Sequence, residues 1–362
     1  MKTLIKWPGG KSSEFEKISS LIPSFDRYIE PFFGGGAIFF NLEPKQAIIN
    51  DISTMLISFY NLVKEQNIEF KNYLLSYCYT FNELLNLTDN NYSDILSIYN
   101  SKDYSETNIS NLIDTIISKM TLEGSVILDK DLFKETLIIF VKDKFERTQK
   151  NNEKKPFSAE DMKNNLKTGF TSGYYMYFRN IYNQLALKTI EKDEAYRIAN
   201  FYFIREYCYG SMFRYNSKGE FNIPYGGISY NTKNFKTKVD AIFNANVEGL
   251  FRNTEICCSD FEKFFETHPL TRNDFMFLDP PYDTEFSDYE GKDFTKKDQA
   301  RLAECLKKTE AKFILIIKNT DYIYNLYRNH FRILTFDKNY TYNVRSRNDR
   351  AVEHLIITNL PE

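Results

Sequence analysis

Short apolar runs of strand length lie near both ends of the chain, and a long region with helical spacing separates them. Two runs precede that region and five follow it. They occupy residues 27–36, 46–53, 255–260, 274–282, 313–319, 331–336 and 353–359. Their length is that of β-strands, so the pattern predicts a sheet built from the two ends of the sequence.

The middle region, from about 56 to 200, is rich in apolar residues at three- and four-residue steps. Such steps place side chains on one face of a helix. The clearest series is Phe70, Leu74, Tyr77, Phe81 and Leu84. We therefore expect a mainly helical region with a buried face.

Two other segments extend this picture. Residues 295–310 join two late strand-like runs, and Thr295 is placed as an N-cap, which predicts a helix there. Residues 147–165 are polar and charged, so we expect a mobile linker.

Strand, helix and strand in succession favour a mostly parallel sheet that is covered on both faces. The last two runs are joined by a polar segment without helix signals, which predicts an antiparallel edge pair. The expected fold class is therefore α/β. Residues 1–55 and 251–362 would form the sheet domain, and 56–250 an inserted, mainly helical domain.

Composition fits an ordinary soluble globular protein, with 42% hydrophobic and 27% charged residues. The N-terminus reaches a Gly-Gly pair too early for a signal peptide, and no apolar run approaches membrane-spanning length. Five cysteines without a CxxC pair indicate reduced thiols in a cytoplasm. The three histidines are too scattered for a metal site, so we expect no metal.

The net charge is only −2, but basic residues gather in two stretches. One runs from Arg205 to Lys238, and the other from Lys338 to Arg350. Together they would form one electrostatic footprint for a polyanion if folding brought them together. On charge alone, two solvated loops are the better interpretation.

The first strand-like run ends in three glycines, which let a chain turn sharply and let a ligand approach the backbone. Asp51 follows at the end of the next run, about twenty residues on, where the ribose-binding acid of a doubly wound sheet stands. The segment matches neither GxGxxG nor a P-loop. The pair favours an adenosine-containing cofactor, although a plain turn and a helix cap at Asp51 remain open.

Trp7, the only tryptophan, lies beside two glycines and Lys11. The lysine would reach a carboxylate or phosphate, and the indole would cover an apolar ligand face. A buried aromatic with a flexible lead-in explains the segment equally well.

The run at 274–282 ends in Asp279, Pro280, Pro281 and Tyr282. The Asp279 carboxylate and the Pro280 carbonyl are two hydrogen-bond acceptors at a rigid spacing, which suits an NH₂ group with two hydrogens. Tyr282 adds a flat face on which a ring can stack. The corner therefore predicts a site for a planar amine. The alternative, a Pro-Pro strand terminator with a capping acid, requires neither the tyrosine nor the acid at those positions.

The DPPY corner, with EPFFGGG upstream and KWPGGK at the start, resembles the Dam-type (D12 class) adenine-specific DNA methyltransferases. FRYNSKGEFNIPYGG at 213–227 is similar to a further stretch of that family, as are YYMYFRNIYN and FTKKDQARLAECL. Residues 75–170 exceed what compact members carry and receive no assignment from these motifs.

The resemblance implies a Rossmann-like sheet that binds S-adenosylmethionine and an inserted domain that recognises double-stranded DNA. The reaction would methylate the exocyclic N6 amine of a flipped adenine, with GATC as a candidate target. The implied catalytic residues are Asp279, Pro280, Pro281 and Tyr282. The implied cofactor-binding residues are Trp7, Lys11, Glu30, Pro31, Phe32, Gly34, Gly36, Asp51, Asp260, Phe261 and Asp279.

Basic, aromatic and amide groups in the 213–227 stretch have the composition of a DNA-reading loop, built as a β-hairpin with Gly219 at its turn. Tyr215 would wedge into the gap left by the flipped base. The implied DNA-binding residues are Arg214, Tyr215, Asn216, Lys218, Asn222, Pro224, Arg345 and Arg347, with Arg350 as a further phosphate contact.

Other classes remain as alternatives. An inactive, sequence-specific DNA-binding relative would keep the reading loop without catalysis. A methyltransferase for RNA, or for another planar amine, would keep the corner. The asparagine typical of amide-directed corners is absent here, because the first position is Asp279. We further expect a cytoplasmic monomer or weak dimer, no membrane partner, and a cognate restriction endonuclease as a candidate companion.

Overall fold

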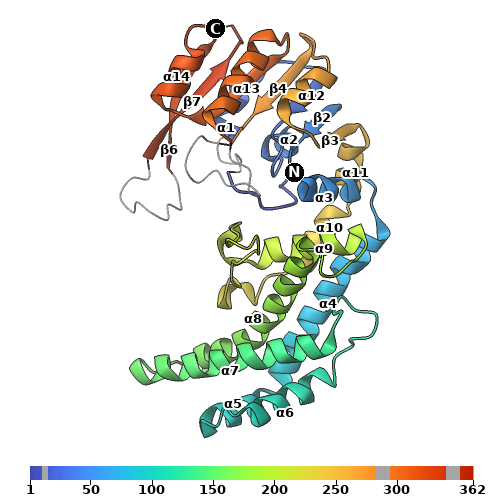
Figure 1. Cartoon of the computed structure of the whole chain (residues 1–362), viewed down its shortest axis with the longest axis vertical. Coiled ribbons are helices and arrows are strands. Elements are labelled where there is room, and N and C mark those ends of the chain that lie inside the picture. Colours follow the sequence, from blue (N-terminus) through green and yellow to red (C-terminus); the bar gives the residue numbers. More distant parts are fainter. Residues whose placement is uncertain (10–14, 282–293, 340–350, 362) are drawn as a thin grey trace. The chain divides into compact units, whose positions relative to one another are not determined.

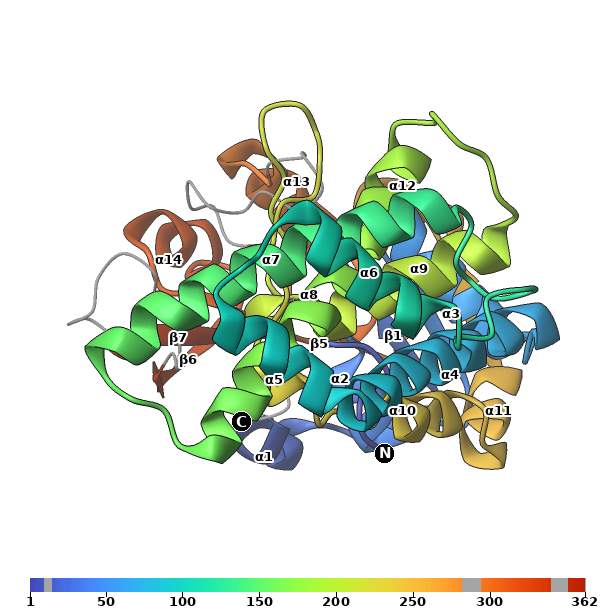
Figure 2. The ribbon, with the colours of Figure 1, turned by 90° about the horizontal axis from the view of Figure 1, so that it is seen from below.

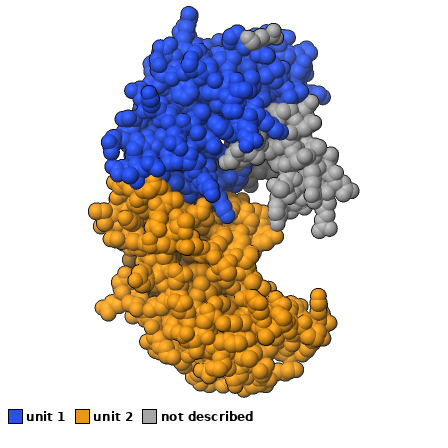
Figure 3. Space-filling model, turned by 180° about the vertical axis from the view of Figure 1, so that it is seen from behind, with its two compact units in different colours: residues 1–64, 245–362 blue, residues 65–244 orange. Residues whose placement is uncertain are grey.

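The structure is a computed structural model that describes residues 1–9, 15–281, 294–339 and 351–361. The chain forms two compact units, coloured separately in Figure 3. Unit 1 consists of Met1–Lys64 and Ala245–Glu362, and unit 2 is Glu65–Asn244. These limits differ slightly from the expected 55/56 and 250/251, because α3 (Thr54–Lys64) and α11 (Ala245–Arg252) pack against each other within unit 1.

Unit 1 contains a seven-stranded sheet with the order β3-β2-β1-β4-β5-β7-β6. The strands are β1 (Arg27–Glu30), β2 (Ala47–Asn50), β3 (Thr254–Cys257), β4 (Asp274–Leu278), β5 (Lys312–Lys318), β6 (Arg332–Asn339) and β7 (Ala351–Thr358). The first five pair in parallel, while β7 is antiparallel to both β5 and β6. The predicted mostly parallel α/β sheet with an antiparallel edge is therefore confirmed.

The strand order places a switch point between β1 and β4. Successive strands β1, β2 and β3 extend the sheet to one side, and β4 and β5 extend it to the other. The connections therefore leave a crevice outside the carboxyl ends of β1 and β4, where doubly wound sheets bind their ligands. Both the glycine turn and the Asp279 corner follow these two strands directly.

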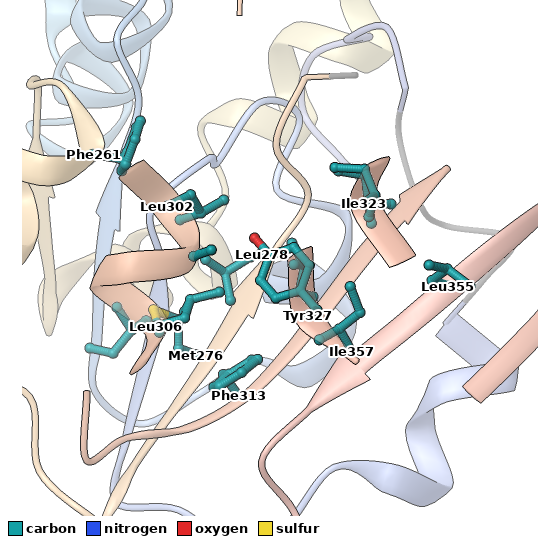
Figure 4. Close-up of a cluster of buried hydrophobic side chains, with 14 of the residues drawn as sticks. Phe261, Met276, Leu278, Leu302, Leu306, Phe313, Ile323, Tyr327, Leu355 and Ile357 are labelled. Atoms are coloured by element: carbon teal, nitrogen blue, oxygen red, sulfur yellow. The ribbon is translucent and has the colours of Figure 1, made fainter. Parts of the chain in front are cut away.

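Helices cover both faces of the sheet (Figure 1). Besides α3 and α11, those of unit 1 are α1 (Phe15–Ile18), α2 (Ala37–Leu42), α12 (Phe261–Thr267), α13 (Lys296–Lys308) and α14 (Asp321–Tyr327). On one face, α12, α13 and α14 enclose an apolar cluster with β4, β5 and β7, shown in Figure 4. On the other, Tyr28 of β1 packs on Phe39 of α2, which meets Phe251 of α11.

The helix predicted at 295–310 is confirmed as α13. Thr295 is its N-cap and forms a capping box with Asp298, in which each side chain meets the other residue's backbone N–H. Leu302, Ala303 and Leu306 are its buried apolar residues. The charged remainder of the helix faces away from the core.

Unit 2 is built mainly from helices. They are α4 (Ile68–Asn90), α5 (Tyr92–Ser101), α6 (Glu106–Ile117), α7 (Lys130–Lys154), α8 (Ala159–Ala186), α9 (Glu194–Tyr207) and α10 (Phe235–Ile242). Helix α7 lies alongside α8, and α4 packs on both α8 and α9, as Figure 1 and Figure 2 show. The predicted buried face of α4 is confirmed at all five positions from Phe70 to Leu84.

The linker predicted at 147–165 is wrong. Helix α7 continues to Lys154 and α8 begins at Ala159, so only 155–158 separate them. One buried residue per turn suffices for a helix packed on one side, and α7 supplies Phe133, Leu137, Val141 and Phe145 at such steps. The polar residues that suggested a linker occupy the exposed faces of this helix pair.

Two further observations concern the whole of the described chain. None of its helices combines the length and apolarity that crossing a bilayer requires. The five cysteines, all within the described residues, form no disulfide there.

Candidate active site

The glycine turn after β1 needs glycine for two separate reasons. Gly34 and Gly36 adopt φ values of +50° and +65°, which side chains disfavour. A Cβ on Gly34 would also lie 2.8 Å from Cδ1 of Trp7, and one on Gly36 would lie 2.5 Å from the Phe33 ring. Trp7 is half-buried against this turn, so the structure brings the N-terminal motif and the glycine motif together.

Asp51 holds the glycine turn in place. Gly34 N–H donates to Asp51 Oδ2 at 2.9 Å, and Ser53 N–H donates to Oδ1 at 2.9 Å. The Tyr60 hydroxyl donates to the Gly34 carbonyl at 3.1 Å from α3. Asp51 therefore connects the turn after β1 with the start of α3, whose first residue lies three positions further along the chain.

Glu30 is a buried carboxyl group at the end of β1. It is 2% exposed and accepts a hydrogen bond from the Tyr28 hydroxyl at 2.8 Å. Burial holds the pKa of Glu30 well above its usual value, and the charges of Asp279 and Asp51 raise it further, while the bond from Tyr28 lowers it. Carboxyl groups from the ends of β1, β2 and β4 therefore share one electrostatic environment.

The corner after β4 lies where the sequence predicts it. Asp279 is half-buried, Pro280 is buried and Pro281 is half-buried. The Pro281 carbonyl accepts a hydrogen bond at 3.0 Å from Nε2 of Gln299 on α13. Tyr282, the fourth residue of the motif, and Lys11 of the N-terminal motif lie outside the described residues.

Asp260 is the N-cap of α12, one of the two interpretations that its position allows. Its Oδ1 accepts from Glu262 N–H at 3.0 Å and from Arg301 Nη2 at 2.6 Å. Arg301 also binds Glu262 and Asp298, so one guanidinium on α13 joins three carboxylates. The adenine-contacting role that the family implies for Asp260 remains a prediction.

Phe32 and Phe261, far apart in sequence, meet in one aromatic cluster. Their ring centroids are 5.5 Å apart, and Phe294 lies within 5.8 Å of both. The Arg301 guanidinium lies 4.8 Å from the Phe261 centroid, on the cluster's edge. The cluster gives the glycine turn and α12 a common apolar support.

Asn50 is a site residue that sequence reasoning missed. It is 1% exposed, and its Nδ2 donates to the carbonyls of Pro31 and Ser259, each at 3.0 Å. Its Oδ1 accepts from the N–H and the hydroxyl of Ser259. Asn50 therefore joins the loops that follow β1, β2 and β3. The only available signal was a polar residue closing an apolar strand just before Asp51.

In unit 2 the 213–227 stretch contains the predicted hairpin. Tyr215 bridges Phe221, and Gly219 at the turn has a φ of +77°. Asn216 Oδ1 accepts from Lys218 and Glu220 N–H, and its Nδ2 donates to the Glu220 carboxylate. The side chain of Asn216 therefore stabilises the turn through hydrogen bonds to residues within it.

Helix α8 holds this hairpin through polar side chains. Asn183 pairs with both backbone groups of Phe221, donating to its carbonyl at 3.1 Å and accepting from its N–H at 2.8 Å. Tyr175 and Arg179 both donate to the Ile223 carbonyl. The hydroxyls of Tyr182 and Tyr215 lie 2.9 Å apart, where either can donate.

The predicted DNA-binding residues fall into three groups. Arg214, Lys218 and Pro224 are exposed. Tyr215, Asn216 and Asn222 are half-buried and bonded within the unit, Asn222 through Arg214 Nε at 3.0 Å. The predicted contacts Arg345, Arg347 and Arg350 lie outside the described residues.

Comparison with known proteins decides the family. The model of the D12 class N6 adenine-specific DNA methyltransferases matches residues 7–122 and 133–342, which is most of the chain. The chain belongs to this family. It is therefore an enzyme of the adenine-specific DNA methyltransferase class. The match includes 75–122 and 133–170, so most of the segment that the motifs left unassigned lies inside it.

Several curated relatives span nearly the same length. The chain is 25% identical over 365 residues to the Type II methyltransferase M.CviBI of Paramecium bursaria Chlorella virus NC1A, covering 99% of this chain and 100% of that protein. It is 28% identical over 337 residues to M.MjaIII of Methanocaldococcus jannaschii, covering 89% and 85%. It is 24% identical over 328 residues to a Vibrio cholerae DNA adenine methylase, covering 88% and 82%.

Proposed function

We propose that this enzyme transfers a methyl group from S-adenosylmethionine to the N6 amine of an adenine extruded from double-stranded DNA. The observation that carries the proposal is the pairing of β1 with β4. It sets the glycine turn and the Asp279-Pro280 corner side by side at the switch point of the sheet. A cofactor and an acceptor base would meet between them.

The corner suits the chemistry of a poor nucleophile. The lone pair of an adenine amine is delocalised into the ring. Hydrogen bonds from its two N–H groups to the Asp279 carboxylate and the Pro280 carbonyl would localise that pair toward the methyl donor. As the N–C bond forms and the methyl–sulfur bond breaks, the amine releases a proton to the Asp279 carboxylate and from there to water. Catalysis is then mainly alignment and preorganisation.

The residues after β1 fit the proposed cofactor. S-adenosylmethionine supplies a methyl group on a positively charged sulfur and also carries an ammonium group. The carboxylates of Asp51 and Asp279 lie close enough to Glu30 to act on its charge, and their negative charge in this crevice favours a cationic ligand. Trp7 lies against the glycine turn, where an indole would border the bound cofactor. We assign the ribose hydroxyls to Asp51 and the adenine edge to Asp260 on family grounds.

The hairpin is the proposed DNA-reading element. Lys218 is exposed in its turn and Arg214 is exposed beside the Tyr215–Phe221 bridge, and both would contact phosphates or base edges. Tyr215 would fill the gap left by a flipped base only after its hydroxyl leaves Tyr182. The exposed cations are therefore the better first contacts. With Arg345 and Arg347 as further phosphate contacts, binding would weaken steeply as salt rises.

The deciding experiment compares genomic DNA from a host that lacks adenine methylation, with and without this enzyme, by single-molecule sequencing. One recurring sequence with N6-methyladenine is expected, and GATC is the candidate. Methylated RNA with unmodified DNA would instead support the RNA alternative. Cofactor and site-specific DNA binding without transfer would support the inactive relative.

A variant locates the chemistry. Asp279→Ala should lose transfer by at least about 10³-fold while S-adenosylmethionine binding stays measurable by calorimetry. Glu266→Ala, which changes an exposed acid on α12, is the matched control and should retain full activity. Full activity of Asp279→Ala would refute the assignment of the corner.

Two relatives are named Type II methyltransferases, which supports our proposal that a restriction endonuclease accompanies this enzyme. We also propose that the enzyme is cytoplasmic and acts as a monomer or weak dimer. DNA methylated by the enzyme would then resist one endonuclease of the same target sequence. Sedimentation of the purified protein at micromolar concentration would report its oligomeric state.

A further inference from the structure

A fully buried glutamine on α13 contacts the proposed catalytic corner. Gln299 is 0% exposed, and its Nε2 donates to the Pro281 carbonyl at 3.0 Å. Its Oε1 is also buried and has no hydrogen-bond partner in the described part of the chain. The side chain therefore makes one bond to the corner and leaves a buried acceptor unsatisfied.

Packing alone does not explain a glutamine at this position. A methionine or leucine has a similar volume and would place no unsatisfied side-chain polar atom in the core. The other buried residues of α13 are apolar: Leu302, Ala303 and Leu306. What the glutamine adds is an N–H donor directed at Pro281.

That donor restrains the backbone angle that the second proline leaves open. Pro280 and Pro281 each fix φ but not ψ. The ψ angle of Pro281 sets the plane of its carbonyl and the direction in which the chain leaves toward residue 282. A hydrogen bond to that carbonyl from a buried helix residue holds this angle.

Helix α13 is itself held on both sides of Gln299. The Thr295–Asp298 capping box fixes its first turn. Arg301 ties it to Asp260 and Glu262 at the start of α12. The helix therefore joins the corner after β4 to the loop after β3.

We propose that Gln299 is a positioning residue for methyl transfer, which holds the Asp279–Pro280 acceptor pair in line with the methyl donor. This inference rests on the proposed function. Misplacement of a reacting group by an ångström costs on the order of 10²-fold in rate. Loss of the Gln299 donor should therefore lower the transfer step and leave cofactor affinity nearly unchanged.

The test measures the single-turnover rate of methyl transfer to DNA for Gln299→Met and Gln299→Glu. The methionine variant should lose about 10- to 100-fold in rate, with a thermal midpoint no lower than wild type and an S-adenosylmethionine Kd within about twofold. A carboxyl buried in place of the amide favours its protonated form, whose O–H can donate to Pro281. The glutamate variant should therefore regain activity relative to wild type as pH falls.

Leu306→Met, at a buried position of the same helix, is the control and should keep the wild-type rate. An unchanged rate in Gln299→Met would overturn the positioning role. So would a glutamate variant whose activity relative to wild type does not change with pH. A wild-type enzyme that methylates no DNA would instead overturn the proposed function, so the two failures are distinguishable.

A second, independent observation concerns three side chains at the β3 edge of the sheet. The Nε2 atom of His268 lies 3.5 Å from the Cys257 sulfur and 3.3 Å from Oε1 of Glu255. All three ligand-type atoms lie within 4.8 Å of one another. Glu255 and Cys257 are two residues apart on β3 and share one face of it, and His268 follows α12.

The imidazole is oriented as a metal ligand would be. Its Nδ1 lies 3.0 Å from both the Phe264 carbonyl and the Thr267 hydroxyl. In the tautomer whose Nδ1 donates to that carbonyl, the Nε2 lone pair faces Cys257 and Glu255 and is available to a metal. The ring also stacks on Phe264 with centroids 4.6 Å apart. In a tetrahedral zinc site, bond lengths imply sulfur–nitrogen and nitrogen–oxygen separations of about 3.6 and 3.3 Å.

The geometry points to a divalent, thiophilic cation site at Glu255, Cys257 and His268, with Zn²⁺ as the cation and water as the fourth ligand. The expectation of no metal rested on the spacing of the histidines alone, whereas this set contains one histidine. Bound metal would clamp β3 to the end of α12, on either side of the Asp260 loop. A protonated His268 paired with Glu255 is the competing arrangement.

Chelator-treated protein titrated with Zn²⁺ in a calorimeter tests this site. We expect one equivalent bound, a rise in thermal midpoint, and at least tenfold weaker binding in Cys257→Ser and in Glu255→Gln. Cys258→Ser, which changes the adjacent exposed cysteine, should bind as wild type does. Absence of stoichiometric binding, or equal binding in Cys257→Ser, would overturn the site in favour of the ion pair.

Discussion

The two candidate sites are held by different kinds of hydrogen bond. In unit 1 the supports are charged: Arg301 joins three carboxylates beside the candidate site, and Arg27 binds Asp274 at the opposite end of the sheet, where β1 and β4 begin. In unit 2 the hairpin is held mainly by neutral side chains of α8, above all Asn183 and Tyr175.

The difference follows from what each unit can contribute. The sheet of unit 1 supplies rigidity through its strand ladders, and a guanidinium reaches several carboxylates from loops that meet at its ends. The hairpin at 213–227 has one isolated bridge, Tyr215–Phe221, and a second bridge joins its Tyr225 to Cys208. Its backbone therefore depends on partners from a neighbouring helix. Amides and phenols bond directionally without the desolvation cost of a charge. The supports of unit 1 should therefore depend on pH, and those of unit 2 should not.

The largest expected effect comes from breaking the ion pair between Arg27 and Asp274 in unit 1. Asp274 is 3% exposed and accepts two bonds from Arg27 and one from Thr271 N–H. Asp274→Ala should lower the free energy of unfolding by about 3 kcal/mol, measured by urea denaturation, because it leaves the guanidinium without its partner. Arg272→Ala breaks an exposed ion pair with Glu310 and should cost less than about 0.5 kcal/mol. An equal loss of unfolding free energy in the two variants would contradict the idea that the buried ion pair stabilises unit 1 more than an exposed one.

Acid should remove the Asp274 effect. Bonds from Arg27 and Thr271 outweigh burial and hold the pKa of Asp274 below its ordinary value of 3.8. A lowered folded-state pKa contributes stability that is present above about pH 3.8 and is lost as pH falls below it. The difference between wild type and Asp274→Ala should therefore shrink below pH 3.8 in denaturation curves. A constant difference would show that the charge of Asp274 is not what matters.

Glu30 should show the opposite trend. Burial raises its folded-state pKa, so the native state favours the protonated carboxyl, and stability is lost as pH rises above about 4.5. Glu30→Gln should gain stability relative to wild type between pH 5 and 8, with no gain below pH 4.5. Thermal midpoints across that range check the sign. A gain that is largest in acid would contradict it.

A smaller effect is expected for the neutral support of the hairpin. Asn183→Ala removes two bonds to the Phe221 backbone and should cost about 2 kcal/mol. Hydrogen exchange at residues 214–222 should accelerate, and the change should be similar at pH 5 and pH 8. Asn180→Ala, at an exposed position of the same helix, is the control and should leave exchange unchanged.

The smallest effect is expected for Tyr175→Phe. Its hydroxyl donates to the Ile223 carbonyl at 2.9 Å, but Arg179 donates to the same atom at 3.3 Å. Because one donor remains, the free energy of unfolding should fall by only about 1 kcal/mol. Changing both residues should cost clearly more than the sum of the single changes. Simple additivity would show that the two donors do not substitute for each other.

Much of the fold could be predicted because its signals are local. Runs of four to eight apolar residues, the N-cap at Thr295 and the four-residue steps of α4 all reflect neighbours in sequence. The failed linker at 147–165 has the same origin. A helix packed on one side needs few apolar residues, so a polar stretch does not distinguish a linker from the exposed face of a helix pair.

The site could be predicted only in part. The glycines and prolines could be recognised from their effect on the backbone, and Asp279 from its place directly before two prolines. Asn50, Gln299 and Arg301 act on partners 18 to 209 residues away, and no nearby motif names those partners. Asn216 shows the converse. The composition of the 213–227 stretch predicted that Asn216 contacts a base, but in the folded chain its side chain bonds within the turn.

The amino-acid sequence by itself determined where strands and helices form and where the backbone must turn, because periodicity and the limits on φ act between neighbours. Only the tertiary structure decided that β4 lies beside β1 and that Asn50 joins three loops. It also decided which polar side chains of the hairpin face inward. A hydrogen bond depends on two groups meeting in space, and that meeting is settled by how whole elements pack.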